Sequence, residues 1–279
     1  MWKKPCNCAI RLTLASLLSV GALSAQAATV KPGVLQVGTD LTYPPYNYFD
    51  AQKQPAGFDV EFMTALGKAT GLKVQFLDTR FENLIIGLNG NKFDVVASTL
   101  YVTPERAQKI TFIPYMKTGV SIAVSVTSKN NLLTPESLCG KKVSSIKGAA
   151  WIANLKKMGE GYCASKGLGT IDVREFPTSP EASQAVMSGG VDAQMEDSAV
   201  LKDAVAKTGG RLVIRSKQNF YPVIVGLGLN QQNKALQETL QNGLNKLKSM
   251  GVYQKLLAKY NVSAPSTEEF KAAITPAAQ

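Results

Sequence analysis

The 279-residue sequence contains no histidine. This absence excludes Ser-His-Asp and Cys-His catalysis, and it excludes every metal site that uses an imidazole ligand. We expect neither a metal ion nor a cofactor.

Long hydrophobic runs are scarce, and the run at 12–23 lies close to the start of the chain. It is preceded by the basic residues Lys3, Lys4 and Arg11 and followed by Ala25-Gln26-Ala27. This order is typical of a secretory signal that is cleaved near Ala27. The run is too short to cross a bilayer as a helix, for which about 20 residues are needed.

Cysteines are few. Cys6 and Cys8 lie upstream of the expected cut, so we expect no lipid anchor at the cut itself. Cys139 and Cys163 remain, and two cysteines in an oxidising compartment favour a single disulfide. In the chain-entropy model such a link contributes about 3 kcal/mol. The alternative, a redox-active pair, requires the close CxxC spacing that this pair lacks.

Acidic residues are in deficit, which gives a formal net charge of +11. The lysines and arginines are scattered, and no basic tract interleaved with aromatic residues is present, as nucleic-acid binding would require. We interpret the charge as a solvated surface that can attract anions, and expect no nucleic-acid partner.

The first half of the chain alternates strand and helix patterns, which predicts βαβ units and a largely parallel sheet. Gly57-Phe58-Asp59 leads into a helix that Gly71 ends, and Thr103-Pro104-Glu105 begins another with Thr as N-cap. The other expected elements are strands at 34–39, 73–77 and 93–97 and a helix at 81–88.

A second block repeats the alternation. Its expected strands lie at 142–146, 171–176 and 191–195, and its helices begin at Thr134, Ala149, Ser179 and Ser198. Extended runs at 119–126 and 221–229 flank this block, and two amphipathic helices follow the second run.

Two βαβ blocks joined by two extended runs predict an α/β protein whose chain crosses twice between lobes, with a hinge and a cleft as the default ligand site. The expected organisation is a signal at 1–27, lobe 1 at 28–120 and 222–262, lobe 2 at 121–221 and a flexible tail at 263–279.

Four motifs in order resemble the amino-acid branch of the bacterial extracellular solute-binding proteins, family 3. They are GTDLTYPPY at 38–46, AGFDV at 56–60, FDVVASTLYVTPER at 93–106 and GVDA at 190–193. The resemblance implies a type II periplasmic-binding-protein fold, two βαβ lobes joined by a two-strand hinge. It also implies a periplasmic monomer without catalytic residues whose partner is the permease of an ABC importer.

In the resembled family, the arginine at the place of Arg106 grips the α-carboxylate of the ligand. Its guanidinium forms two parallel hydrogen bonds with a carboxylate, and a helix start otherwise disfavours a cation. Ser98, Thr99 and Tyr101 precede it and are expected to face the cleft, although Ser98 also suits an ordinary turn. Tyr101 departs from the small residue often found at its place.

In the second block, Asp197 matches the aspartate that takes the α-ammonium of the ligand, and from the residues alone it could instead be the N-cap of the next helix. Glu196 beside it could face the pocket or solvent. Ala149 and Ala150 stand where the family usually has Ser or Thr, so only backbone N–H contacts remain, at Ala150 in particular.

The remaining pocket positions concern the side chain of the ligand. Tyr43 and Phe81 match two positions that sandwich it, and Asp40 is expected to accept from a polar or cationic tip. Asp40 is alternatively a turn residue. Trp151 could narrow the cavity. For each of these aromatic residues, and above all for Tyr46, burial in the core is the alternative.

The leading hypothesis is binding of a free amino acid, with a polar or cationic one favoured, and transfer to the importer. A dehydratase of the cyclohexadienyl or arogenate type on the same scaffold is the alternative, with Glu196 as its general acid. A sensor ectodomain would require a membrane segment after the lobes, and we expect none.

Overall fold

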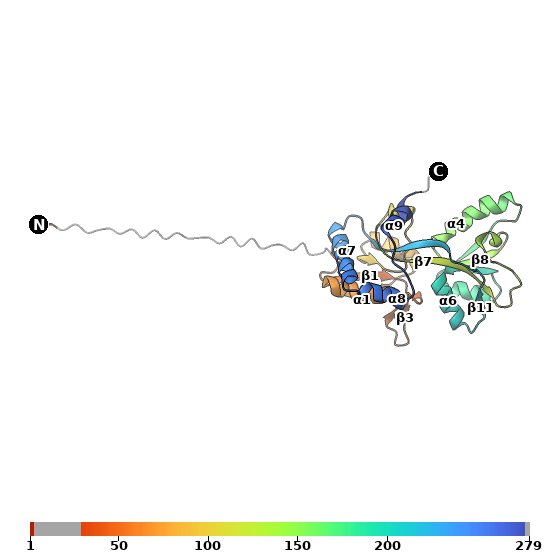
Figure 1. The fold of residues 1–279 in the computed structure, drawn as a ribbon, viewed down its shortest axis with the longest axis horizontal. Helices are drawn as coiled ribbons and strands as arrows, with labels where there is room; N and C mark the ends of the chain where they lie inside the picture. Colours follow the sequence, from red (N-terminus) through yellow and green to blue (C-terminus); the bar gives the residue numbers. More distant parts are fainter. Residues whose placement is uncertain (3–28, 277–279) are drawn as a thin grey trace.

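The computed structural model describes residues 1–2 and 29–276, so residues 3–27 of the predicted signal and its cut lie outside the described part. Figure 1 shows two α/β lobes, with long strands that run from one to the other. The strands of the main sheet lie in the order β5-β1-β6-β12-β7-β10-β8-β9, and β11 pairs with β7.

Lobe 1 contains the parallel strands β1 (Val34–Thr39), β5 (Lys73–Asp78) and β6 (Val95–Val96). Lobe 2 contains the parallel strands β8 (Lys142–Ile146), β9 (Asp172–Phe176) and β10 (Ala193–Asp197), together with β11 (Leu212–Ile214). The parallel pairing within each lobe confirms the prediction from the alternating pattern.

Two long antiparallel strands join the lobes, β7 (Thr111–Ser125) and β12 (Phe220–Leu229). One end of β7 pairs with β12 and its other end pairs with β10 and β11 of lobe 2, while the far end of β12 pairs with β6 of lobe 1. The chain therefore crosses between the lobes twice, as the extended runs predicted.

Helices cover the sheet of each lobe (Figure 1). Helix α1 ends at Gly71, which adopts the left-handed φ of 76° that favours glycine. The helices of lobe 1 are α1 (Phe58–Thr70), α2 (Leu84–Asn89), α3 (Pro104–Ala107), α7 (Lys234–Ser249) and α8 (Val252–Lys259), and those of lobe 2 are α4 (Trp151–Met158), α5 (Ser179–Met187) and α6 (Ser198–Lys207).

Three short strands form a small antiparallel sheet that the sequence did not predict. They are β2 (Thr42–Tyr43), β3 (Asn47–Phe49) and β4 (Pro55–Ala56). Strands this short carry too few residues to show alternation. Their role is positional, because β2 places the Tyr43 ring at the junction of the lobes.

The structure differs from the expected flexible tail at 263–279. The N–H of Lys117 donates to the carbonyl of Ser263 at 2.8 Å, and a capping box between Ser266 and Glu269 begins helix α9 (Thr267–Ile274). Phe270 of α9 packs against a buried cluster of lobe 1. Composition alone suggested fraying, but the cap and the apolar contact stabilise this helix. Residues 277–279 lie outside the described part.

Candidate functional site

A small cavity lies where the two lobes meet, and side chains of both lobes enclose it. Its volume is about 10 Å³, no more than a single water molecule requires. Lobe 1 lines it with Tyr43, Phe81, Thr99, Tyr101 and Arg106, and lobe 2 lines it with Ile146, Ala149, Ala150 and Trp151. The lobes are therefore closed on one another, and their own side chains fill the space between them.

Arg106 provides the basic group among the described residues that line this cavity. Thr103 caps helix α3, as predicted, by accepting the Arg106 N–H at 3.2 Å. The guanidinium donates from Nη1 to the Tyr101 carbonyl at 2.7 Å and from Nη2 to the Gly148 carbonyl of lobe 2 at 3.0 Å. It also lies 5.5 Å from the centre of the Phe81 ring.

Two of the five N–H donors of the guanidinium are used by these carbonyls. Desolvation lowers the pKa of Arg106 to about 10, so the group keeps its charge at neutral pH. Three donors on a permanently charged fork remain to bind a carboxylate.

Asp197 is fully buried and accepts hydrogen bonds at both oxygens. Its Oδ1 caps helix α6 by accepting the N–H of Ala199 at 2.9 Å and of Val200 at 3.4 Å. Its Oδ2 accepts from the Tyr101 hydroxyl at 2.8 Å and from the Thr118 hydroxyl at 2.7 Å. Asp197 is thus an N-cap, and the Tyr101 side chain lies between it and the cavity.

Glu196 is also fully buried and points inward rather than to solvent. Its Oε1 accepts from the Tyr43 hydroxyl of lobe 1 at 2.6 Å and from the Asp197 N–H at 3.0 Å. Burial raises the pKa of Glu196 to about 7, and Tyr43 and the backbone oppose this only in part. Glu196 is therefore partly protonated near neutral pH.

A third buried carboxylate, Asp59 in the first turn of α1, was missed in the sequence. It accepts from the Tyr115 hydroxyl at 2.6 Å and from the N–H of Thr99 at 2.7 Å. Burial raises its pKa to about 6. The sequence showed Asp59 only as a helix-start residue, which is usually exposed. Here it holds Thr99 in a left-handed conformation, with φ of 48°, at the cavity wall.

Asp59, Glu196 and Asp197 share an unusual feature. Within residues 29–276, none of them forms an ion pair with a lysine or arginine. Tyrosine hydroxyls take the place of a cation at each carboxylate. Burying a carboxylate is costly unless a proton or a cation compensates the charge. The region behind the cavity can therefore accept positive charge.

Besides Asp197, two predicted site residues do not line the cavity. Asp40 is fully buried and accepts from the Thr42 hydroxyl at 2.7 Å and the Phe81 N–H at 2.8 Å, and it pairs with Arg80 at 3.1 Å. The Ser98 hydroxyl accepts the N–H of Asp40 at 3.0 Å. These contacts match the turn roles considered above, and the structure does not bring Asp40 or Ser98 to the cavity wall.

The structure places Trp151 and Tyr46 in different surroundings. Trp151 lines the cavity, with Nε1 donating to the Ser145 hydroxyl at 2.9 Å and its ring edge-on to Tyr101 at 5.5 Å between centres. Tyr46 is buried away from it, and its hydroxyl lies 3.2 Å from that of Thr118. Because Thr118 donates to Asp197, Tyr46 is the donor of this pair.

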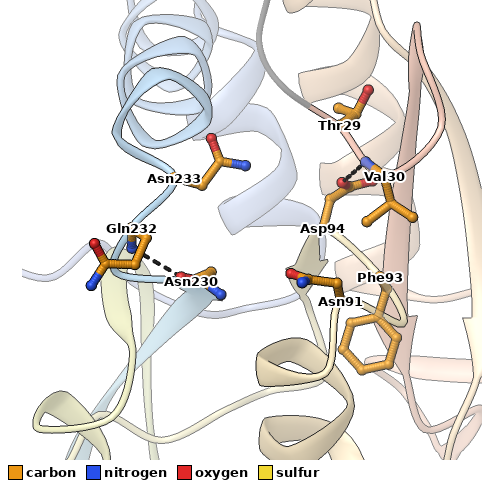
Figure 2. A pocket seen from close by; sticks show the side chains of 8 residues that line it. All are labelled: Thr29, Val30, Asn91, Phe93, Asp94, Asn230, Gln232 and Asn233. Atoms are coloured by element: carbon orange, nitrogen blue, oxygen red, sulfur yellow. Dashed lines mark hydrogen bonds between the residues drawn. The ribbon is translucent and has the colours of Figure 1, made fainter.

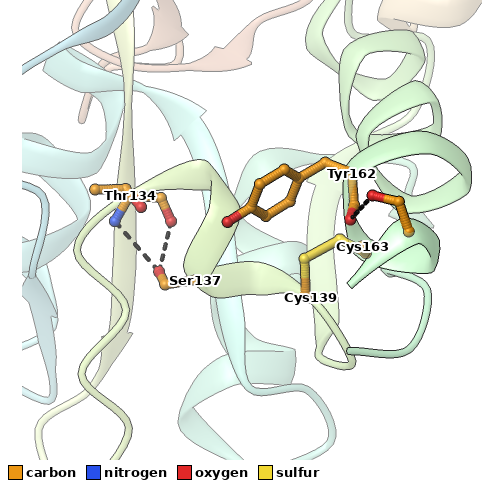
Figure 3. The surroundings of a disulfide bond; sticks show 6 residues. Thr134, Ser137, Cys139, Tyr162 and Cys163 are labelled. Atoms are coloured by element: carbon orange, nitrogen blue, oxygen red, sulfur yellow. Dashed lines mark hydrogen bonds between the residues drawn. A yellow bond between two sulfur atoms is a disulfide. The ribbon is translucent and has the colours of Figure 1, made fainter. Parts of the chain in front are cut away.

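Cys139 and Cys163 form a disulfide in lobe 2, as predicted (Figure 3). It joins the end of a 3₁₀ turn (Pro135–Leu138) to a helical turn (Gly159–Cys163) that extends α4. The bond lies outside the cavity wall and is structural.

Another hollow, of about 660 Å³, lies on lobe 1 (Figure 2). Amide side chains line it, and Asp94, the charged group among its described lining residues, is held by the N–H groups of Val30 and Gln36 at 2.6 and 2.7 Å. The described residues of its lining include no cation and belong to lobe 1 alone. In the described part of the chain, no acidic or cysteine cluster suits a metal ion, and no helix is long and apolar enough to cross a membrane.

Comparison with known proteins gives one consistent picture. The model of the bacterial extracellular solute-binding proteins, family 3, matches residues 35–263. The histidine-binding periplasmic protein of Salmonella typhimurium is 27% identical over 259 residues, covering 90% of this chain and 96% of the relative. The ABC transporter arginine-binding protein 1 of Escherichia coli is 29% identical over 251 residues, covering 88% and 96%.

A solved structure, an ancestral amino acid-binding protein described as a precursor of cyclohexadienyl dehydratase, is 32% identical. It matches with a TM-score of 0.68 over 82% of this chain and 95% of its own. Helix α9 lies beyond the residues that the family model matches.

Proposed function

Because the chain belongs to the bacterial extracellular solute-binding proteins of family 3, we propose that it captures a free amino acid between its lobes in the periplasm. It then delivers the amino acid to the permease of an ABC importer. The position of the Arg106 guanidinium carries the proposal, because this group lies in a cavity that both lobes line. The type II periplasmic-binding-protein fold provides the two lobes.

Arg106 is the group suited to the α-carboxylate. Nη1 holds the Tyr101 carbonyl of the same lobe, which positions the guanidinium before a ligand binds, and Nη2 reaches the Gly148 carbonyl of lobe 2 when the lobes are closed. A preorganised guanidinium gives up little side-chain freedom when it binds a carboxylate. The neighbouring ring of Phe81 and the Ala149–Ala150 turn then contact the body of the ligand.

The α-ammonium is expected at Asp197, and a polar or cationic side chain is favoured. Support comes from the buried carboxylates Asp59, Glu196 and Asp197, which no basic side chain of the described residues neutralises. No second basic residue of the described chain lines the cavity to hold an acidic side chain.

An amino acid does not fit a cavity of about 10 Å³, so the lobes must open to admit it. The ligand then stabilises the closed form only through its higher affinity for that state. The relatives named as periplasmic and ABC transporter binding proteins support the location and the permease partner.

A thermal-shift screen of the free amino acids tests the proposal, on protein refolded to remove carried-over ligand. Binding raises the melting temperature with ln(1 + [L]/Kd). We expect shifts with arginine, lysine, ornithine, histidine or glutamine. A shift with only dicarboxylic or aliphatic amino acids contradicts the side-chain argument, and no shift with any amino acid contradicts the proposal.

A second candidate is a dehydratase of the cyclohexadienyl or arogenate type. The observation that favours it is Glu196, whose burial raises its pKa to about 7, a value suited to a general acid. Two observations speak against a dehydratase. Glu196 accepts a hydrogen bond from the Tyr43 hydroxyl, and Glu196 is not among the residues that line the cavity. Incubation of the pure protein with prephenate or arogenate tests it, and turnover would establish an enzyme.

A further inference from the structure

The Tyr101 side chain lies at Asp197, where the proposed function expects the α-ammonium of the ligand. Its hydroxyl crosses from lobe 1 to Asp197 of lobe 2 at 2.8 Å. We propose that Tyr101 is an internal competitor, which closes the ligand-free lobes through this bond and which the ammonium of the amino acid must displace. This inference rests on the proposed function and adds a residue that sets the affinity.

The first support is the hydrogen-bond count at Asp197. An ionised carboxylate has about four acceptor positions. Thr118, Tyr101 and the N–H groups of Ala199 and Val200 supply four donors. Thr118 lies on the hinge strand β7, two residues from Val120, which pairs with Asp197, and the two N–H groups belong to the first turn of α6. Tyr101 is the donor that comes from lobe 1 outside the hinge, so its donating position is the one that an ammonium can take.

The second support is the space around the ring. Tyr101, Ala150 and Trp151 line both the cavity and a neighbouring hollow of about 520 Å³. Val102, Pro104 and Val223 also line the hollow, as do Ala272 and Ala273 of α9. The Tyr101 ring is therefore part of the wall between the two spaces. A turn of the ring into the hollow leaves Asp197 open and enlarges the cavity.

The third support is that only the side chain has to move. The Tyr101 carbonyl accepts from Arg106 at 2.7 Å. On either side, the Val102 N–H donates to the Ile224 carbonyl at 2.8 Å and the Gly226 N–H donates to the Leu100 carbonyl at 3.0 Å. The backbone is thus tied to β12 and to the binding arginine, while the ring turns about its side-chain bonds. Displacement then leaves the carboxylate-binding group in place.

The energetic consequence follows from population arithmetic. When a ligand binds only the open form, its apparent affinity equals its affinity for the open form multiplied by the fraction of molecules that are open. A hydrogen bond to a charged group favours closure by roughly tenfold or more. An ammonium forms a stronger bond to a carboxylate than a phenol does, which is why it can replace Tyr101.

The test is Tyr101→Phe, which keeps the ring and removes the competing hydroxyl. Calorimetric titration with L-arginine, L-histidine and L-glutamine should show affinity about tenfold higher than the parent for whichever binds. Tyr260→Phe is the matched control, because the Tyr260 hydroxyl also donates to a carboxylate, Glu61, at 2.7 Å within lobe 1. It should leave the affinity unchanged.

Small-angle scattering of the ligand-free proteins gives a second readout. Tyr101→Phe should show a larger radius of gyration than the parent and Tyr260→Phe, because its lobes open more often. A lower affinity in Tyr101→Phe would make the hydroxyl a ligand contact and overturn the inference, as would equal affinity with an equal radius. If none of the three amino acids binds any variant, the proposed function fails, and the inference that rests on it fails too.

Discussion

The two lobes contribute opposite chemistry to the cavity. Lobe 1 supplies the guanidinium of Arg106 and four hydroxyl-bearing or aromatic side chains, whereas lobe 2 supplies three aliphatic residues and Trp151. The acids of lobe 2, Glu196 and Asp197, lie behind that wall and are held by tyrosines of lobe 1. Lobe 1 therefore carries the exposed polar contacts, and lobe 2 carries charge that becomes accessible only when a tyrosine moves.

From this difference we expect the two lobes to have separate roles in binding the ligand. In the proposed function, Arg106 of lobe 1 binds the carboxylate end of the ligand. Asp197 of lobe 2 binds the ammonium in place of its present bond to Tyr101. Substitutions in the two lobes should therefore have unequal effects.

The largest effect is expected for Arg106→Ala. It removes two charge-assisted hydrogen bonds to the ligand, each worth about 1.5–3 kcal/mol, so affinity should fall about 100-fold or more. Calorimetric titration with the amino acid that gives the largest thermal shift measures this. Arg106→Lys keeps the positive charge but loses the paired N–H donors, so its affinity should lie between those of the parent and Arg106→Ala.

Arg174→Ala is the matched control, because Arg174 is exposed and pairs with Asp172 of the same strand. It should bind like the parent. An Arg106→Ala protein that holds its ligand as tightly as the parent would remove lobe 1 from its leading role.

The disulfide of lobe 2 should contribute the next largest effect, and lobe 1 has no counterpart in the described residues. Replacing Cys139 and Cys163 together by serine should lower the free energy of unfolding by about 3 kcal/mol. Urea denaturation measures it. Because the bond lies outside the cavity wall, affinity at a permissive temperature should be unchanged; a loss of affinity with unchanged stability would contradict the structural role.

The pH dependence of stability tests the buried acid of lobe 2. Burial raises the pKa of Glu196 from the ordinary value of 4.5 to about 7, so between these values the folded state keeps a proton that the unfolded state releases. Its contribution to stability is present in full below the unfolded pKa and is lost as pH rises toward 7.

Glu196→Gln removes this titration. The free energy of unfolding of the variant minus that of the parent should therefore increase by roughly 2 kcal/mol as the pH is raised from 5 to 8. Asp59, whose pKa is raised to about 6, titrates in the same direction in both proteins and cancels in the comparison. Denaturant unfolding at several pH values measures the difference, and parallel curves would contradict it.

The smallest effect is expected at α9, which lies beyond the matched part of the family. Ser266→Ala removes the capping box and should weaken α9 by about 1 kcal/mol, which speeds amide exchange in residues 267–274. Ser249→Ala is the control, because its hydroxyl donates only to the carbonyl of Lys246, one turn back. Equal exchange in the two variants would show that packing of Phe270 alone holds the helix.

The sequence predicted the elements that local signals define. Thr103 before Pro104 gave the start of α3, Gly71 gave the end of α1, and the alternation of strand and helix gave the parallel sheets. These signals act over a few residues, so they survive in any tertiary context. The structure brings six of the predicted site residues to one cavity between the lobes, and their part in binding a ligand stays a prediction: Tyr43, Phe81, Thr99, Tyr101, Arg106 and Ala150.

The sequence did not predict what depends on contacts between distant residues. Asp40 and Asp197 look alike in the chain, yet Asp40 is held within lobe 1 by Thr42 of its own turn and by Arg80, which follows β5, while Asp197 receives Tyr101 from the opposite lobe. Burial of Asp59 depends on Tyr115, which is far away in sequence. No local pattern records which partner a carboxylate meets.

A crystal structure of the refolded protein with the amino acid that gives the largest thermal shift tests the central claim most directly. We predict the ligand between the lobes, its carboxylate on the Arg106 guanidinium and its ammonium on Asp197, with the Tyr101 ring turned toward α9. A ligand bound elsewhere, such as the amide-lined hollow on lobe 1, with Tyr101 still donating to Asp197, would contradict it.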